Sequence, residues 1–353
     1  MSQKVYFTNS PAIAIDRYIT DSGSPKTFIL TDENTAEHVL PVILSESRQL
    51  RDAEVITVKA GDVNKNIDSL SYIWNRLQNG GATRKSLLIN LGGGMITDMG
   101  GFAGATFKRG INFVNMPTTL LSAVDAAVGG KTGINFNGLK NEVGAFKEAD
   151  AVIISTVFFK TLPVEELKSG YAEMLKHGLI DGKDTYRRLI NHNVESADWD
   201  NLLDILEESV NVKRRIVTED PLEHGIRRAL NLGHTIGHAF ESHAMKHNSP
   251  IPHGYAVAWG CVTELTLSCL SLGFPSEELH RFATYIYDTY GPYTFTCDDY
   301  PELIELMHHD KKNTSSEINF TLLKDVGKIE IDCTCNEDDI KSALDIFRDL
   351  MHV

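Results

Sequence analysis

An α/β domain followed by a mainly α-helical domain is the fold class that this sequence predicts. Up to about Ser155, short apolar runs alternate with segments of helical periodicity, which is typical of a mostly parallel sheet with crossover helices. Beyond that point, long segments of helical periodicity follow one another. A chain of 353 residues exceeds the usual size of one compact core. We therefore expect one domain over residues 1–158 and a second over residues 159–353.

Short apolar runs in the first domain predict the strands of a Rossmann-like sheet. These runs are Thr27–Thr31, Val55–Val58, Ser86–Leu91, Ile111–Met116 and Ala151–Ser155. Ala36–Ser47 and Ile67–Gln78, which lie between them, have the apolar spacing of helices. Ligands of such sheets gather at the carboxyl ends of the strands, so we expect binding residues there.

The second domain is predicted to consist of helices and one hairpin. The expected helices are Pro163–Ile180, Trp199–Val217, Arg227–Lys246, Tyr255–Leu272 and Glu277–Tyr290. A late hairpin pairs Ile318–Leu323 with Lys328–Asp332 and turns at Val326-Gly327. Asn336 is expected to cap a final helix whose first turn is rich in acids.

Composition excludes several classes of protein. Lys and Arg number 34 and Asp and Glu 48, so the formal charge is 34 − 48 = −14, which argues against nucleic acid or an anionic membrane as partner. No apolar run is expected to cross a bilayer, and the first residues lack the core of a signal peptide. The five cysteines have no paired CxxC spacing and are expected to be free thiols. A cytoplasmic protein is the prediction.

The segment Leu91–Gly104 is rich in glycine and directly follows a predicted strand. Glycines let backbone N–H groups approach a pyrophosphate, and the N-terminus of a following helix favours an anion. Thr97 stands where the usual dinucleotide fingerprint has its third glycine. A tight strand-to-helix turn with close packing explains the glycines equally well, so both interpretations stay open.

Asp32 and Gly129–Thr132 carry weaker signals. Asp32 ends the first predicted strand, where a carboxylate can accept hydrogen bonds from a ribose, although a turn or a helix cap is its more common role. Gly129–Thr132 is similar to a phosphate loop, but Asp125 occupies the position of the required first glycine. We therefore exclude nucleoside triphosphate binding and keep Lys131 as a candidate anion contact.

Histidines form the strongest candidate site. His234 and His238 are four residues apart and share one helix face, and His253 follows in the next predicted element. Neutral imidazole is a good zinc ligand, and a helical pair with a third ligand is a common way to hold zinc. Each of the three has a glycine beside it, which permits close approach by a ligand or another helix. Spacing leaves open which two bind the metal and which one serves proton chemistry.

Glu173 lies in an otherwise small or apolar helical segment, with Lys176 three residues further on. Such an i,i+3 pair is usually exposed and contributes little, but the apolar neighbours favour burial here. A buried carboxylate needs a cation or a metal. Glu173 is therefore a candidate third ligand beside two histidines.

Other charged groups are expected at the surface. Lys213–Arg215 form a charge run on a predicted helix, which is typical of a solvated face. His243, His247 and His308 lack small neighbours and are expected to be solvated.

Taken together, these segments resemble the 3-dehydroquinate synthase family of the sugar-phosphate cyclase superfamily. Each motif is weak alone, but their order and spacing are specific. The resemblance covers nearly the whole chain, and its motifs are Gly92–Asp98, Met116–Leu121, Gly129–Thr132, Gly138–Asn141, Tyr171–Lys176 and Asn231–His238.

The resemblance implies an enzyme of the shikimate pathway that uses NAD and a divalent metal, Zn²⁺ or Co²⁺. Its substrate would be 3-deoxy-D-arabino-heptulosonate 7-phosphate. Oxidation at C5, phosphate elimination, reduction and an intramolecular aldol closure would give 3-dehydroquinate. Oxidation comes first because the transient ketone makes the neighbouring C–H acidic.

The resemblance also assigns roles to residues. Glu173, His234 and His253 would hold the metal, and His238 would be a proton relay. The substrate would be held by Lys131, Asn141, Lys176, Lys213 and Arg227. Arg109 matches an arginine that reaches the phosphate from the partner in a homodimer. Either Lys311 or Lys312 matches a phosphate-binding lysine.

For NAD, the resemblance implies contacts along most of the first domain. The matching residues are Asp32, Asp62, Lys65, Gly93, Gly94, Asp98, Thr118, Thr119, Leu121, Asp125, Lys131, Lys140, Thr161 and Glu166. Asp62 stands where the family usually has glutamate, so a shorter or water-bridged ribose contact is expected. Tyr255 stands where glutamate is common, and the segment before His253 is somewhat long; neither departure changes the ligand set.

Two other kinds of enzyme remain as alternatives. One is another sugar-phosphate cyclase, which acts on a different phosphorylated sugar. Arg227 and Lys213 are candidate contacts for the carboxylate of the heptulosonate and therefore favour that substrate. The other is a metal-dependent alcohol dehydrogenase of the glycerol dehydrogenase type, which would release NADH. A non-enzymatic binding module has no use for a metal triad beside cations and a dinucleotide site.

Overall fold

The computed structural model describes residues 3–196, 198–308 and 318–353. It divides into two compact units, the first formed by Met1–Pro163 with Ser196–Val210 and the second by Val164–Glu195 with Asn211–Val353. These compact units are not the same as functional domains. The division into functional domains at residues 158 and 159, which the sequence suggested, stays a prediction.

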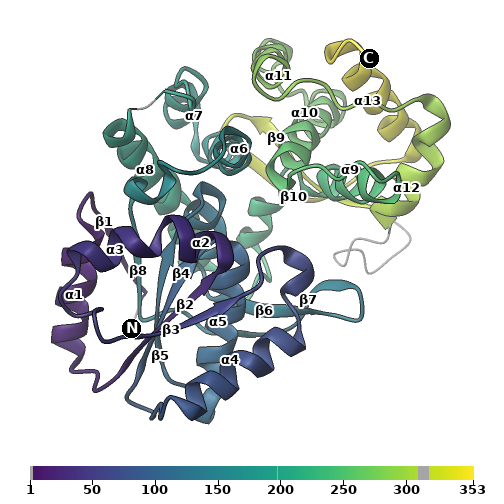
Figure 1. Cartoon of the computed structure of the whole chain (residues 1–353). Coiled ribbons are helices and arrows are strands. Elements are labelled where there is room, and N and C mark those ends of the chain that lie inside the picture. The colour runs from purple at the N-terminus through teal and green to yellow at the C-terminus, as the bar shows by residue number, and fades with distance from the viewer. Residues whose placement is uncertain (1–2, 197, 309–317) are drawn as a thin grey trace. The chain divides into compact units, whose positions relative to one another are not determined.

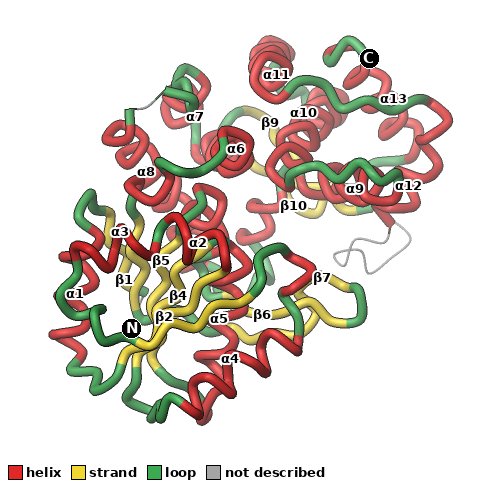
Figure 2. The backbone as a smooth tube through the Cα atoms, in the orientation of Figure 1, coloured by secondary structure: helices red, strands yellow, loops and turns green. Residues whose placement is uncertain are grey.

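A six-stranded parallel sheet forms the centre of the first unit (Figure 2). Its strands, in spatial order, are β1 (Lys4–Phe7), β8 (Ala151–Ile154), β5 (Asn112–Pro117), β4 (Leu87–Gly92), β2 (Thr27–Asp32) and β3 (Glu54–Val58). β4 and β8 are buried along their whole length, as continuous apolar runs in a parallel sheet require. The α/β prediction is confirmed, whereas the short edge strand β1 was missed.

Helices connect these strands. They are α1 (Pro11–Ser22), α2 (Glu33–His38), α3 (Leu40–Glu46), α4 (Ile67–Asn79) and α5 (Gly94–Thr106). The helix predicted over Ala36–Ser47 is two helices, because the chain leaves regular helical geometry at Val39 and restarts with Pro41 in the first turn of α3. Asp32 caps α2, since its Oδ1 accepts a hydrogen bond of 2.9 Å from the Thr35 N–H.

A hairpin absent from the sequence prediction packs against α4 and α5 in the first unit (Figure 1). It consists of β6 (Lys131–Phe136) and β7 (Leu139–Phe146). Asn137 and Gly138 form its turn with φ of 49° and 80°, the left-handed geometry that Asn-Gly adopts in two-residue hairpins. The hairpin brings Lys131, Lys140 and Asn141 onto one supersecondary element.

The second unit is mainly helical. Its elements are α6 (Val164–Asp181), α7 (Lys183–Ile190), the second half of α8 (Trp199–Glu219), α9 (His234–Lys246), α10 (His253–Leu272), α11 (Ser276–Tyr290), α12 (Tyr300–His308), the hairpin β9 (Asn319–Asp325) with β10 (Lys328–Thr334), and α13 (Glu337–Leu350). The late hairpin and the Asn336 cap of α13 are confirmed. The helix predicted over Arg227–Lys246 is a 3₁₀ turn at Ile226–Asn231 followed by α9, because Gly233 has a φ of 78°.

α10 is the central helix of this unit, in contact with α6, α9, α11, α13 and β9. By length and composition alone, it passes the criteria for a membrane-crossing helix. However, 72% of its most apolar window is buried inside the unit. An all-round apolar helix with this burial is a core helix.

Candidate functional site

The β4–α5 turn bears on both interpretations of the glycine-rich segment, close packing and ligand binding. A methyl group added at Gly92 would come within 2.5 Å of the Ile96 side chain, and one at Gly100 within 2.1 Å of Asn90 Oδ1. These glycines let α5 pack closely on the sheet. At Gly94 the nearest atom would be 3.5 Å away, an ordinary contact. Close packing explains Gly92 and Gly100, while Gly94 at the start of α5 leaves room for a ligand.

The carboxyl ends of neighbouring strands bring several candidate NAD residues to one edge of the sheet. Gly92 at the end of β4 pairs with Pro117 at the end of β5, and the Thr118 N–H donates to the Gly92 carbonyl at 3.0 Å. A methyl group at Gly93 would lie 3.2 Å from the Thr119 methyl. Asp32 ends β2, the next strand in the sheet. This is the edge at which parallel sheets bind ligands.

Lys65, Asp98 and Asn141 form a polar cluster beside this edge. The Lys65 ammonium is buried, lies 2.6 Å from Asp98 Oδ2 and donates to Asn141 Oδ1. Asn135 on β6 holds the arrangement: its side chain donates to Asp62 Oδ2 at 3.0 Å and accepts from the Asn141 N–H at 2.9 Å. Sequence reasoning missed Asn135, although its position two residues before the Asn-Gly turn was a usable signal.

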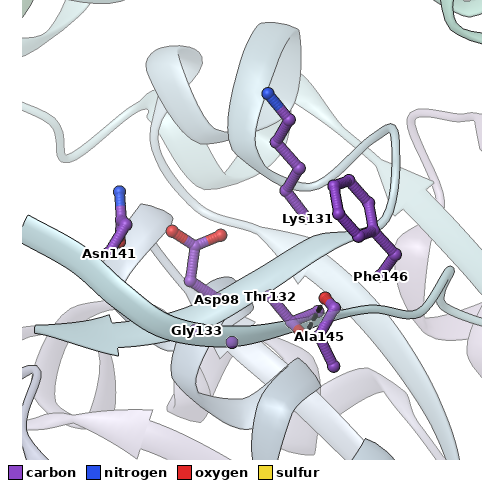
Figure 3. Close-up of a pocket in the computed structure, with 8 residues that line it drawn as sticks. Asp98, Lys131, Thr132, Gly133, Asn141, Ala145 and Phe146 are labelled. Carbon is purple, nitrogen blue, oxygen red and sulfur yellow. Dashed lines mark hydrogen bonds between the residues drawn. The ribbon is translucent and has the colours of Figure 1, made fainter. Parts of the chain in front are cut away.

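A pocket of about 290 Å³ opens within this unit (Figure 3). Asp98, Lys131 and Asn141 line it, together with Phe146. Figure 3 shows Asp98 between Asn141 on one side and Lys131 with Phe146 on the other. Gly129 and Gly130 have φ of 105° and 72° and lead into a strand, not into a helix. The exclusion of a phosphate loop is thus supported, and Lys131 lines a polar pocket.

Other candidate residues of the first unit lie further along the chain. A π-helical turn spans Ser122–Ala126, and such turns are rare and often mark functional sites. Asp125 lies in this turn, and Leu121 directly precedes it. Arg109 is exposed with a φ of 67°, directly after Lys108 at 51°. Lys140 on β7 and Thr161 are exposed.

The three histidines of the second unit are brought together. Their ring centroids are 5.3 Å apart for His234 and His238, 5.6 Å for His234 and His253, and 5.8 Å for His238 and His253. One ring nitrogen of each lies within 4.8 Å of the others. α9 carries the first two, one turn apart, and His253 begins α10.

Hydrogen bonds orient two of these rings. His234 Nδ1 lies 3.1 Å from the Leu232 carbonyl, and His253 Nδ1 lies 3.0 Å from Glu241 Oε2. Because both partners are acceptors, the neutral rings carry their proton on Nδ1 and present the Nε2 lone pair. Carboxylate or carbonyl partners of this kind are usual around histidines that bind metals. Sequence reasoning missed Glu241 as a member of the site.

Glu173 faces these Nε2 atoms. Its Oε1 is 3.5 Å from His234 Nε2 and 3.8 Å from His253 Nε2, and its side chain is 1% exposed. Neither oxygen accepts a hydrogen bond from a described residue, although Lys176, equally buried, ion-pairs with Oε2. The predicted burial is confirmed. A buried carboxylate facing two lone pairs is a donor set that fits a divalent cation.

The glycines beside the histidines have a packing role. A methyl group at Gly254 would lie 1.8 Å from the Ser169 carbonyl on α6, and one at Gly237 would lie 2.9 Å from the Ala256 carbonyl on α10. The helices therefore touch through their backbones. Of the two explanations offered for these glycines, close approach by another helix is the one that the structure supports.

Two further candidate cations of this unit are buried. Arg227 is 3% exposed, and its guanidinium donates to the Pro221 carbonyl at 2.6 Å. Lys213 is 6% exposed, so the expectation of a solvated face was wrong for it, although Arg215 is exposed and pairs with Asp181. Both cations are therefore held inside this unit and not at a solvated face.

Asp220 organises the loop that carries Arg227. Its oxygens accept hydrogen bonds from the backbone N–H groups of His224 at 3.0 Å, Gly225 at 2.7 Å and Arg227 at 3.1 Å. Desolvation would raise the pKa of Asp220, but these backbone hydrogen bonds outweigh it and hold the pKa below its ordinary value. Among other predicted residues of this unit, Glu166 is exposed in the first turn of α6, and Lys311 and Lys312 lie outside the described residues.

The first unit thus has the architecture of a dinucleotide-binding fold, and the second has a histidine–carboxylate cluster among buried cations. Comparisons with known proteins agree with this class. Models of the 3-dehydroquinate synthase N-terminal and C-terminal regions match residues 55–169 and 170–313. The chain is 50% identical over 347 residues to a 3-dehydroquinate synthase of Parabacteroides distasonis, covering 98% of each chain. It therefore belongs to the 3-dehydroquinate synthase family.

Solved structures confirm the fold. A 2-epi-5-epi-valiolone synthase from Streptomyces hygroscopicus, with NAD⁺ and Zn²⁺ bound, superposes with a TM-score of 0.86 at 22% identity, covering 99% of this chain and 97% of that one. A 2-deoxy-scyllo-inosose synthase complexed with carbaglucose-6-phosphate, NAD⁺ and Co²⁺ gives 0.84 at 21% identity, covering 96% and 95%. The predicted α/β sheet unit with a mainly helical second unit is the fold of these proteins.

Proposed function

We propose that the chain is a 3-dehydroquinate synthase, a lyase of the shikimate pathway. It converts 3-deoxy-D-arabino-heptulosonate 7-phosphate into 3-dehydroquinate and phosphate. This proposal rests on 50% sequence identity to a 3-dehydroquinate synthase over nearly the full length of the chain. The histidine–Glu173 cluster supports it from the structure, because this reaction begins with oxidation of a hydroxyl group.

NAD and a divalent metal, Zn²⁺ or Co²⁺, are the cofactors of this proposal, as in the two similar structures. When bound, NAD would take a hydride from substrate C5 and later return it, and the metal would polarise the oxygen at that carbon. Residues 1–158 form the NAD-binding domain in this proposal, and residues 159–353 form the metal- and substrate-binding domain.

The NAD site in this proposal combines the edge of the sheet with the polar cluster. Gly93 and Gly94 present the start of α5 to the pyrophosphate, and Asp32 and Asp62 accept from the ribose hydroxyls. Asp62 is already held by Asn135, which fixes its orientation despite its short side chain. The other contacts are Lys65, Asp98, Thr118, Thr119, Leu121, Asp125, Lys131, Lys140, Thr161 and Glu166.

The metal ligands in this proposal are Glu173, His234 and His253. The donor set fits, because the two histidines present Nε2 toward Glu173 while their Nδ1 atoms are held by the protein. We assign His238, which lies on the same helix as His234, to the proton of the C5 hydroxyl. His234, the metal ligand, and His238, the proton carrier, then lie one turn apart on α9.

Four cations and one amide hold the substrate. Lys131, Asn141, Lys176, Lys213 and Arg227 bind its hydroxyls, carboxylate and phosphate in this proposal. Their local positive charge reconciles an anionic substrate with a net charge of −14. Arg109 reaches the phosphate from the partner of a homodimer, and its left-handed backbone is a form of strain that functional sites often hold. The cell compartment is the cytoplasm.

The test is an assay of purified chain with the heptulosonate phosphate, catalytic NAD and Zn²⁺. We expect release of one phosphate per carbocyclic product, with no net NADH. A different sugar-phosphate cyclase would leave this substrate untouched and accept another phosphorylated sugar. Accumulation of NADH without phosphate would identify a dehydrogenase of the glycerol dehydrogenase type instead.

A further inference from the structure

The far end of α9 carries a second histidine pair, outside the site described above. His243 and His247 are four residues apart, with ring centroids at 4.3 Å. Glu302 on α12 lies opposite, with its Oε2 at 3.3 Å from His247 Nε2. Asp299, just before α12, places Oδ1 at 3.7 Å from His243 Nε2. Ligand atoms of His243, His247 and Glu302 all lie within 4.8 Å of one another.

His243 was expected to be solvated, and that expectation was wrong. The residue is 6% exposed, and its Nε2 is buried with no hydrogen-bond partner among the described residues. Its Nδ1 lies 2.7 Å from the Tyr293 hydroxyl. The ring is thus fixed on one side and unsatisfied on the other.

Tyr293 determines which nitrogen carries the proton. Its hydroxyl donates to the Phe240 carbonyl at 3.2 Å, so its single proton is already used. The hydroxyl must therefore accept from His243 Nδ1–H, and the neutral ring presents a lone pair at Nε2.

That lone pair faces acceptors. Asp299 Oδ2 accepts from the Thr296 N–H at 2.7 Å, and its Oδ1 lies 3.7 Å from His243 Nε2. Glu302 Oε2 lies 3.3 Å from His247 Nε2. A buried lone pair beside two carboxylates and a second imidazole is a donor set that suits a metal cation.

We propose that His243, His247, Glu302 and Asp299 form a second metal site, which takes a Zn²⁺ ion and joins the end of α9 to α12. Two imidazoles and carboxylates are a usual zinc donor set, and the Tyr293 contact to His243 Nδ1 is the orienting partner that such a ligand has. The Lys246 ammonium lies 3.1 Å from Glu302 Oε1 and pairs with that carboxylate from the same end of α9. The same α9 carries His234 and His238 at its start.

The experiment measures zinc stoichiometry on the full chain at buffered micromolar free Zn²⁺. We expect two equivalents in the unchanged chain, and one in His247→Ala and in Glu302→Gln, both of which alter exposed or half-exposed side chains. His280→Ala, a substitution of an exposed histidine on α11, should retain two. Zinc should also raise the Tm of the unchanged chain by more than that of His247→Ala.

Three results would overturn the proposal. The first is that the unchanged chain and His247→Ala each bind one equivalent of zinc. The second is that each binds two equivalents. The third is a proton on His243 Nε2, seen by ¹⁵N NMR in the zinc-saturated chain. The last would show that a proton, and not the metal, occupies His243 Nε2. Turnover of the sugar phosphate is read separately, so failure of this proposal and failure of the synthase assignment are distinguishable.

Discussion

At the scale of single residues, the outcome depends on contacts that lie far away in the sequence. Glu173 and Lys176 were predicted to be buried because their neighbours along the helix are apolar, and they are. Lys213 and His243 were predicted to be solvated from equally local patterns, and they are buried. The partner that decides the case of His243 is Tyr293, fifty residues further on. Local patterns carry no information about such a partner.

The division of roles among the three histidines gives the first prediction. Glu173→Ala removes a metal ligand in our proposal, so it should hold one metal equivalent fewer than the unchanged chain and have no activity. His238→Ala should retain that equivalent and lose about 10²–10⁴-fold in kcat, the usual contribution of a proton relay. Metal analysis and kinetics of the two variants check this. Loss of metal in His238→Ala would reverse the assignment.

Glu241 gives a prediction that sequence reasoning alone could not make. Its carboxylate accepts from His253 Nδ1 and orients the Nε2 lone pair. Glu241→Ala should therefore lower the affinity for the metal by about 10–100-fold without removing a ligand. Competition with a chelator measures this, with Glu277→Ala, an exposed carboxylate on α11, as the control. Equal affinities in the two variants would show that Glu241 does not support the site.

Asp220 positions Arg227 through the backbone. Asp220→Ala should raise the KM for the anionic substrate about tenfold, with less change in kcat. The lowered pKa of Asp220 adds a pH dependence: its stabilising effect is present above the unfolded value near ~3.9 and is lost as pH falls through the folded value. An unchanged KM in Asp220→Ala would show that the loop holds its shape without this side chain.

At the scale of elements, the periodic patterns located most strands and long helices, but not their interruptions. Val39 and Gly233 each divide a predicted helix, because backbone geometry at one residue ends a pattern that side-chain spacing continues. The β6–β7 hairpin was missed even though Asn137-Gly138 is a strong hairpin signal. β7 is almost entirely exposed, and only Gly133 and Ile134 of β6 are buried, so no continuous apolar run marked the hairpin.

Glu264 shows how one helix can cap another. From the middle of α10 its buried carboxylate accepts from the N–H groups of Gly233 at 2.6 Å and Ile236 at 3.2 Å, at the start of α9. A negative charge there is favourable, and the α9 start has no side-chain cap of its own. The start of α9 also holds His234 in place.

We predict that Glu264→Gln lowers the free energy of unfolding by about 1–3 kcal/mol, because an amide cannot accept both hydrogen bonds as well and loses the charge. Glu277→Gln, which changes an exposed acid in the first turn of α11, should have an effect within about 0.5 kcal/mol. Denaturant unfolding of both variants provides the measurement. Similar values for the two would mean that Glu264 is not a cap of structural importance.

At the scale of the whole molecule, the chain combines a parallel sheet unit that suits a dinucleotide with a helical unit that concentrates histidines, Glu173 and buried cations. Net charge, length and strand–helix order predicted the class of enzyme but not its chemistry. The chemistry became visible through the order of motifs and through which side chains the folded units gather. Family membership then directs attention to one reaction, in which a hydride leaves the substrate and comes back.

The return of that hydride is the central claim, and an isotope label tests it most directly. The heptulosonate phosphate carrying deuterium at C5 is converted by the chain with unlabelled NAD and Zn²⁺, and the product is examined by mass spectrometry and NMR. We predict that 3-dehydroquinate retains the deuterium at the corresponding carbon while free NADH stays absent. Deuterium in accumulated NADH would contradict the account, and so would 3-dehydroquinate that has lost the deuterium.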